Sequence, residues 1–141
     1  GFPGESEQDF EDTMQLIRDV NFASCYSFMY SARPGTPAAN MQNLVHDKVS
    51  AERLQRLQAL LNEQQRAFNL ACIGETMPIL LDRKGKRDGQ LQGRSAYNQS
   101  VYVKANERLL SEVVDVKITE GFDKSLTGEV VTSESVLSAA E

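Results

Sequence analysis

The stretch EVVDVKITE, residues 112–120, alternates apolar and polar side chains along its length. Val114, Val116 and Ile118 face one way, while the charged and hydroxyl side chains between them face the other. A period of two predicts a β-strand with one buried face. The segments on either side of this stretch show the same alternation, so the pattern decides the fold class of the chain from Gly74 onward.

Four further short strands are predicted around it, separated by turns that contain Gly, Asp, Asn and Lys. The five predicted strands cover residues 76–81, 91–97, 100–104, 112–120 and 126–131. Five short antiparallel strands suit a small closed or partly open barrel of the oligonucleotide-binding type. The small, polar tail after about residue 132 is expected to fray.

Two helices are predicted before the strands. Ser6 can cap a helix over residues 7–20, with Asp9 three positions later and Phe10, Met14 and Ile17 at helical spacing. Ser50 can cap a longer helix that ends near Cys72 and connects the two halves of the chain. Its apolar stripe consists of Leu54, Leu57, Leu61, Phe68 and Cys72.

Residues 22–30 carry apolar side chains on both faces, which predicts a buried parallel strand. A glycine-rich turn at residues 1–5 precedes the first helix, and a proline-containing loop at residues 31–40 follows the predicted strand. Turn, helix and buried strand form one step of an α/β barrel, which cannot bury its own faces. We therefore expect an amino-terminal part of the same chain to be missing.

The net charge of −5 argues against nucleic acid, but the charges are unevenly distributed. Between Arg83 and Arg108, seven basic residues stand against Asp88 and Glu107: Arg83, Lys84, Lys86, Arg87, Arg94, Lys104 and Arg108. This basic strip is either a docking surface or an ordinary solvated run of charge. No stretch is apolar enough to span a membrane, and the use of only two cysteines fits a reduced cytoplasmic setting.

Two loop motifs in this order carry a family resemblance. Gly1-Phe2-Pro3-Gly4-Glu5 and the run from Tyr30 to Ala38, followed by a long helix and a five-strand module, resemble the carboxyl-terminal half of the radical S-adenosylmethionine methylthiotransferases, above all the branch that acts on tRNA. The last module looks like the TRAM domain of that family. The resemblance implies an α+β chain: residues 1–48 as the last αβ portion of a radical barrel, 49–73 as a connector helix and 74–141 as the TRAM domain.

The resemblance also implies a parent enzyme that methylthiolates a prenylated adenosine beside the tRNA anticodon, using S-adenosylmethionine and two [4Fe-4S] clusters. Its CxxxCxxC motif is not in this chain, where Cys25 and Cys72 are predicted to be small buried hydrophobes. We therefore expect no catalytic residue, no metal site and no bound cofactor here, and a monomer that is inactive alone. The expected partner is the tRNA anticodon stem-loop.

The family places the first turn and the second loop near S-adenosylmethionine. The implied cofactor contacts are Gly1, Phe2, Pro3, Gly4, Glu5 and Arg33. The alternatives are a turn that only leads into the first helix and, for Arg33, a structural salt bridge. His46 is expected to be solvated.

An RNA surface is expected on the strand module, because a cation, an aromatic face and an amide near one turn suit phosphate contact and base stacking. The candidates are Lys84, Lys86, Arg87, Arg94, Tyr97, Asn98 and Lys104. In the alternative, Tyr97 packs inside the barrel and Arg94 is solvated. Many family members carry Asn-Asn-Arg where this chain has Tyr97-Asn98-Gln99, so the arginine of that run is absent.

Two rival functions remain open from the sequence. One is a stand-alone RNA-binding or scaffold protein, and the other is the paralogous methylthiotransferase that modifies a ribosomal protein. The arginine- and proline-containing loop at residues 31–38 favours the tRNA branch.

Overall fold

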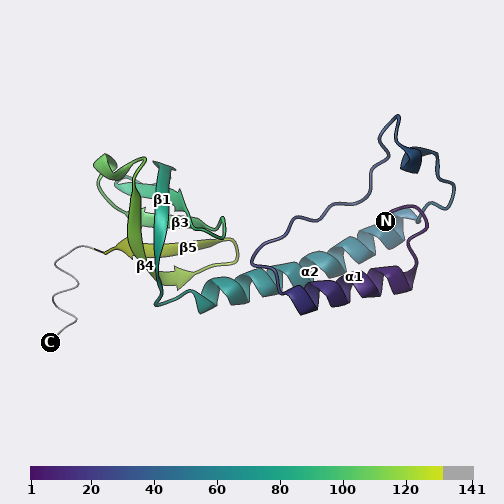
Figure 1. The fold of residues 1–141 in the computed structure, drawn as a ribbon, viewed down its shortest axis with the longest axis horizontal. Coiled ribbons are helices and arrows are strands. Elements are labelled where there is room, and N and C mark those ends of the chain that lie inside the picture. The colour runs from purple at the N-terminus through teal and green to yellow at the C-terminus, as the bar shows by residue number, and fades with distance from the viewer. Residues whose placement is uncertain (132–141) are drawn as a thin grey trace. The chain divides into compact units, whose positions relative to one another are not determined.

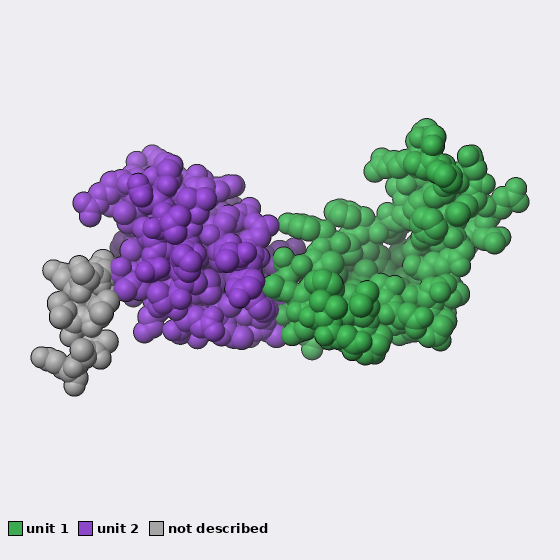
Figure 2. All heavy atoms as spheres, viewed as in Figure 1, with its two compact units in different colours: residues 1–64 green, residues 65–141 purple. Residues whose placement is uncertain are grey.

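A computed structural model describes residues 1–131 of the chain (Figure 1). The chain divides into two compact units, Gly1–Gln64 and Gln65–Glu141, which are described separately (Figure 2). The tail predicted to fray after about residue 132 lies outside the described residues. Within the described part, no helix has the length and apolar character needed to cross a membrane.

The first helix of unit 1, α1 (Glu7–Val20), has the predicted bounds and cap. The Asp9 N–H donates to the Ser6 hydroxyl at 3.1 Å, and the Ser6 N–H donates to the Asp9 carboxylate at 2.8 Å. This reciprocal pair is a capping box, which satisfies two backbone donors at the helix start. The predicted apolar stripe is buried, with its three residues between 3% and 5% exposed: Phe10, Met14 and Ile17.

The second helix, α2 (Asp47–Ala71), begins three residues before the predicted cap. Ser50 lies inside the helix and is buried, so its assignment as the capping residue was wrong. The ring of His46 takes that position instead, because its Nδ1 accepts a hydrogen bond from the Lys48 N–H at 3.2 Å. His46 is exposed, as expected.

Residues 22–30 do not form the predicted buried strand. They are irregular, and Tyr26 and Phe28 are more than four-fifths exposed. In the described part of the chain, no backbone N–H from Phe22 to Gly35 donates to a backbone carbonyl. A strand needs a paired neighbour, and unit 1 contains no other strand among its residues. The following loop holds a short 3₁₀ helix, η1 (Pro37–Asn40).

Unit 2 contains all five predicted strands, closed into a barrel (Figure 1). They are β1 (Thr76–Lys84), β2 (Gln90–Arg94), β3 (Ser100–Lys104), β4 (Val113–Gly121) and β5 (Ser125–Val130), with the 3₁₀ helix η2 (Glu107–Leu109) before β4. Around the barrel the order is β1-β2-β3-β5-β4. The α+β class and the barrel predicted from the sequence are confirmed.

One pairing in the barrel departs from the all-antiparallel expectation. β3 and β5 run parallel, with Tyr102 beside Thr127. A closed ring with an odd number of strands cannot alternate direction at every pair, so one parallel contact is a geometric necessity. Here it falls between the third and the last strand.

The barrel core is formed by the inward-facing residues of the strands and one residue that follows α2. These are Ile79, Leu81, Leu91, Val101, Val103, Val116, Ile118, Leu126 and Cys72. Cys72 is therefore buried as predicted, but Cys25 is exposed, which corrects that prediction. Cys25 belongs to the irregular segment that has no partner strand to cover it.

Candidate nucleic-acid interface

The turn between β1 and β2 presents the first group of expected RNA contacts. Lys86 and Arg87 are exposed there, and Lys84 precedes them at the end of β1. A shallow depression of about 310 Å³ lies among the turn residues and Glu107. Lys84 Nζ contacts the Glu107 carboxylate at 2.8 Å, so part of its charge is compensated. Lys86 and Arg87 are the more available cations of this group.

The turn between β2 and β3 presents the second group. Arg94 Nη1 donates to the backbone oxygen of Asn98 at 3.1 Å, while Asn98 adopts a left-handed backbone conformation with φ of 62°. Tyr97 is 56% exposed and packs edge-to-face on Phe68, with ring centroids 5.1 Å apart. Tyr97 therefore lies outside the barrel, and Arg94 is held against its own turn.

A buried polar network supports this second turn from below. Asn69 is fully buried in the last turn of α2 and donates to the backbone oxygen of Phe122 at 2.6 Å. Its side-chain oxygen accepts from Gln99 Nε2 at 2.7 Å, and Gln99 Oε1 accepts from the Ser95 hydroxyl at 2.8 Å. Buried polar groups that are hydrogen-bonded to one another in this way fix local geometry. The network holds both ends of the Ser95–Gln99 turn.

The structure separates the expected RNA contacts into two groups. Lys104 pairs with Gln90 at the β1–β2 end of the hairpin, whereas Arg94 pairs with Ser100 at the other end. The two ends are four residue steps apart along the strand, which is roughly 13 Å. Lys84, Lys86, Arg87 and Lys104 gather at one end, and Arg94, Tyr97 and Asn98 at the other.

Between these groups, the outer face of the hairpin carries residues that the sequence analysis missed. Gln92 and Tyr102 lie opposite each other on β2 and β3, both partly exposed. The alternation in Ser100-Val101-Tyr102-Val103-Lys104 is the signal that could have found Tyr102, because both valines are buried. Strands 2 and 3 form the binding face of oligonucleotide-binding folds.

Arg83 belongs to the basic strip but is paired with its neighbour. Its Nη2 contacts the Asp82 carboxylate at 3.0 Å. This hydrogen bond lowers the pKa of Asp82 from its usual value. Asp82 therefore stays ionised, and the pair adds little net charge to the surface.

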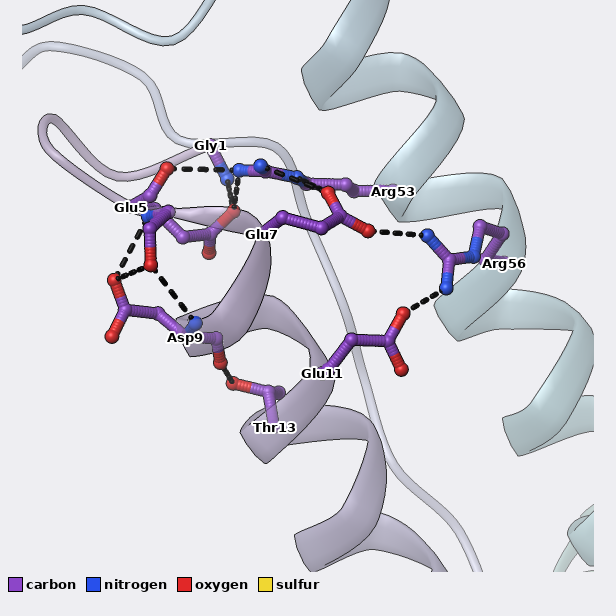
Figure 3. A network of polar contacts seen from close by, with 9 residues as sticks. Gly1, Glu5, Glu7, Asp9, Glu11, Thr13, Arg53 and Arg56 are labelled. Carbon is purple, nitrogen blue, oxygen red and sulfur yellow. Dashed lines mark hydrogen bonds and ion pairs between the residues drawn. The ribbon is translucent and has the colours of Figure 1, made fainter.

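In unit 1, the glycine-rich turn is joined to α2 by a network of carboxylates and arginines (Figure 3). Arg53 Nη1 donates to the Glu5 carboxylate at 2.8 Å and to its backbone oxygen at 3.0 Å. Arg53 also contacts Glu7 at 3.1 Å, and Arg56 bonds to Glu7 at 2.9 Å and to Glu11. Hydrogen bonds from Arg56 and then Arg53 hold the pKa of Glu7 below its usual value.

The turn itself is engaged in contacts within unit 1. The Gly4 N–H donates to the Asn43 oxygen at 2.6 Å, and the Glu5 N–H donates to the Phe2 oxygen at 2.9 Å. The Phe2 ring packs edge-to-face on Tyr30 at 5.4 Å, and Pro3 is buried. These contacts are those of a structural turn, and the expected contacts of residues 1–5 with S-adenosylmethionine stay a prediction.

Arg33 is exposed in its loop, where its backbone oxygen accepts from the Thr36 N–H and hydroxyl at 3.2 Å and 2.7 Å. Among residues 1–131, its guanidinium forms no ion pair. The alternative of a structural salt bridge therefore finds no partner in this part of the chain. Its contact with a cofactor or substrate stays a prediction.

The residues present do not fit an iron–sulfur cluster. Cluster iron is held mainly by cysteine thiolates, up to four per cluster. Cys72 lies in the core of unit 2 and Cys25 in the irregular segment of unit 1. In residues 1–131, no group of three or more His, Cys, Asp or Glu side chains is arranged to hold a metal.

Known proteins resemble this chain both in its barrel and over nearly its whole length. Residues 70–131 match the TRAM domain family. The chain is 50% identical to the tRNA-2-methylthio-N(6)-dimethylallyladenosine synthase of Rickettsia canadensis over 133 residues, covering 94% of this chain and 30% of that protein. The enzyme of the same name from Sphingopyxis alaskensis is 54% identical over 129 residues, covering 92% and 29%.

Among solved structures, a conserved protein from Methanococcus maripaludis matches 43% of this chain and 80% of its own, at 25% identity and a TM-score of 0.37. By its fold and sequence, unit 2 is a TRAM domain from residue 70 to residue 131. Over nearly its whole length, the chain is similar to enzymes named tRNA-2-methylthio-N(6)-dimethylallyladenosine synthase. It spans about three tenths of the length of the relatives that it matches.

Proposed function

We propose that this chain is the carboxyl-terminal part of a cytoplasmic enzyme that methylthiolates a prenylated adenosine beside the tRNA anticodon. The observation that carries the proposal is the 50% identity, over nearly the whole chain, with synthases named for that product. The same identity supports the tRNA branch over the paralogue that acts on a ribosomal protein. In the whole enzyme, S-adenosylmethionine and two [4Fe-4S] clusters would supply the radical chemistry and the sulfur.

The role proposed for the TRAM domain is to dock the anticodon stem-loop. The two groups of cations at the ends of the β2–β3 hairpin support this role, because phosphate contacts position an RNA without reading its sequence. Lys86 and Arg87 supply charge at one end. Arg94, held on the Asn98 carbonyl beside the half-exposed Tyr97, supplies a cation and an aromatic face at the other.

The test is a fluorescence-anisotropy titration of a labelled anticodon stem-loop with the 141-residue chain. The double variant Arg94→Ala with Lys86→Ala is expected to weaken binding roughly tenfold in about 0.1 M salt, since it removes one cation from each end. The matched control is Arg18→Ala with Lys48→Ala, which removes two exposed cations of unit 1. Equal affinities for the two double variants would overturn this surface, and no binding by the unaltered chain would overturn the docking role.

A further inference from the structure

A groove of about 400 Å³ runs over the outer face of β3 and β5, where the barrel closes with its parallel pair. Its lining residues come from the β1–β2 turn and from the four strands β2, β3, β4 and β5, and include Arg87, Gln90, Tyr102, Lys104, Thr127 and Glu129. The volume lies in the range of about 300 to 1,000 Å³ that is usual for small-ligand sites. Only Arg87 and Lys104 belong to the RNA surface expected from the sequence.

The register of the strands explains why these side chains meet. Tyr102 lies beside Thr127, and two residues further along the parallel strands come Lys104 and Glu129. Side chains two apart share one face of a strand, so all four point out of the barrel. Tyr102 and Thr127 therefore form the middle of the groove, with a cation and a carboxylate at the same end.

The lysine and the glutamate at this end of the groove do not form an ion pair with each other. Among residues 1–131, neither Lys104 nor Glu129 forms an ion pair, although Glu129 also lies beside Lys117 on β4. Both side chains are exposed. A site with a cation and a carboxylate at one end suits a ligand that carries both an anionic group and hydrogen-bond donors.

A nucleotide has that combination. The partly exposed ring of Tyr102 offers a stacking surface for a base, and Lys104 and Arg87 offer contacts for the phosphates beside it. A carboxylate accepts hydrogen bonds but repels phosphate, so Glu129 suits the base edge. Guanine fits best, because its ring N–H and its amino group donate side by side to the two oxygens of one carboxylate.

We propose that this groove binds one unstacked guanine base of a single-stranded RNA segment. Tyr102 stacks on the base, Glu129 accepts from its Watson–Crick edge, and Arg87 and Lys104 meet the flanking phosphates. The proposal rests on the RNA-docking role proposed above and adds a base-reading site to it. It differs from that role in its residues, because Tyr102 and Glu129 are not among the phosphate contacts.

The test uses two labelled RNA pentanucleotides, each with four uridines around a central purine nucleoside. That nucleoside is guanosine in one probe and inosine, which lacks the amino group, in the other. The unaltered 141-residue chain is expected to bind the guanosine probe several-fold more tightly. Tyr102→Leu is expected to weaken binding of both probes roughly tenfold, and Tyr102→Phe, which keeps the ring, less than about twofold. Glu129→Gln should abolish the preference for guanosine, whereas the change Glu120→Gln, at another exposed carboxylate, should preserve it.

The outcomes separate this proposal from the docking role. If Arg94→Ala with Lys86→Ala weakens stem-loop binding while Tyr102→Leu leaves pentanucleotide binding unchanged, the groove is overturned and the docking role stands. Equal binding of guanosine and inosine by the unaltered chain overturns the assignment of Glu129. If the unaltered chain binds no RNA, both proposals fail. Because Tyr102→Leu alters a half-buried position, Tyr102→Phe and Glu129→Gln keep the test valid if it unfolds.

Discussion

Asn69 and Gln99 form a buried amide pair, 2.7 Å from oxygen to nitrogen, between the last turn of α2 and the turn that carries Tyr97. Asn69 also donates to the Phe122 carbonyl, so one side chain bonds to two loops of the barrel. Thirty positions separate the two residues in the sequence. This pair makes the end of α2 part of the TRAM domain.

Asn69→Ala should therefore destabilise unit 2 by about 2 to 4 kcal/mol, because it leaves the Gln99 amide and the Phe122 carbonyl without their partner. The measurement is amide hydrogen exchange of β2 and β3 in the full chain. Asn62→Ala, at an exposed position on the same helix, is the matched control and should change stability by less than about 0.5 kcal/mol. Equal effects of the two changes would contradict the role of the buried pair.

Gly121→Ala should also destabilise the barrel. An added Cβ would lie 2.7 Å from the Asn69 backbone oxygen, and backbone atoms of α2 cannot move aside easily. We expect a loss of about 1 to 3 kcal/mol, as for other overpacked sites, measured by urea unfolding. In the comparison variant, Gly85→Ala, the obstructing atoms belong to the flexible Gln90 side chain, so the loss should be smaller. A larger loss for Gly85→Ala would contradict this account.

The packing of α1 should weaken in acid. The pKa of Glu7 is lowered from 4.5 in the folded chain by Arg56 and Arg53, so the unfolded chain binds more protons as the pH falls. The stability that ionised Glu7 adds to the folded chain is fully present above pH 4.5, and it is lost as the pH falls through the lowered pKa. Urea unfolding followed by helical circular dichroism from about pH 6 to about pH 3 should show this loss.

Glu7→Gln should flatten that dependence, because a neutral amide does not titrate in this range. Glu63→Gln, at an exposed position of α2, should leave the dependence unchanged. An unaltered slope for Glu7→Gln would show that other carboxylates cause the acid sensitivity.

Glu107→Gln should strengthen RNA binding. Glu107 contacts Lys84 at 2.8 Å, and its removal frees that cation while deleting a negative charge beside Lys86 and Arg87. We expect a gain of about two- to threefold in anticodon stem-loop affinity at low salt, measured by anisotropy. Glu112→Gln removes an exposed carboxylate that lies outside the depression formed by the β1–β2 turn and Glu107. It should change the affinity for RNA less than Glu107→Gln does. Weaker binding by Glu107→Gln would indicate that RNA does not contact the surface of the β1–β2 turn.

The elements governed by local patterns were predictable. Ser6 and Asp9 indicate the start of α1, and the alternation around Val116 indicates β4. Both patterns can be read from a few neighbouring residues. Elements that depend on distant partners were not. Residues 22–30 have the composition of a strand, yet pairing requires another strand that unit 1 does not contain among its described residues.

The same limit applies to the candidate sites. The cations of the β1–β2 turn were predicted by type, but the pairing of Lys84 with Glu107 depends on the approach of η2. The near-complete burial of Arg53 was missed, because its partners Glu5 and Glu7 lie more than forty positions away. Tyr102 was predictable from alternation, but its place beside Thr127 depends on how the barrel closes.

The parallel contact of β3 with β5 has a consequence for synthesis on the ribosome. β1, β2 and β3 leave the ribosome before β5, so one edge of β3 stays unpaired until residues 125–130 have been synthesised. Until then, the nascent sheet exposes unpaired backbone groups on β3, and such an edge can pair with another chain. A break in translation between β4 and β5 would leave both neighbours of β5 open, so the shortest truncations that remove this strand should be the most prone to aggregate.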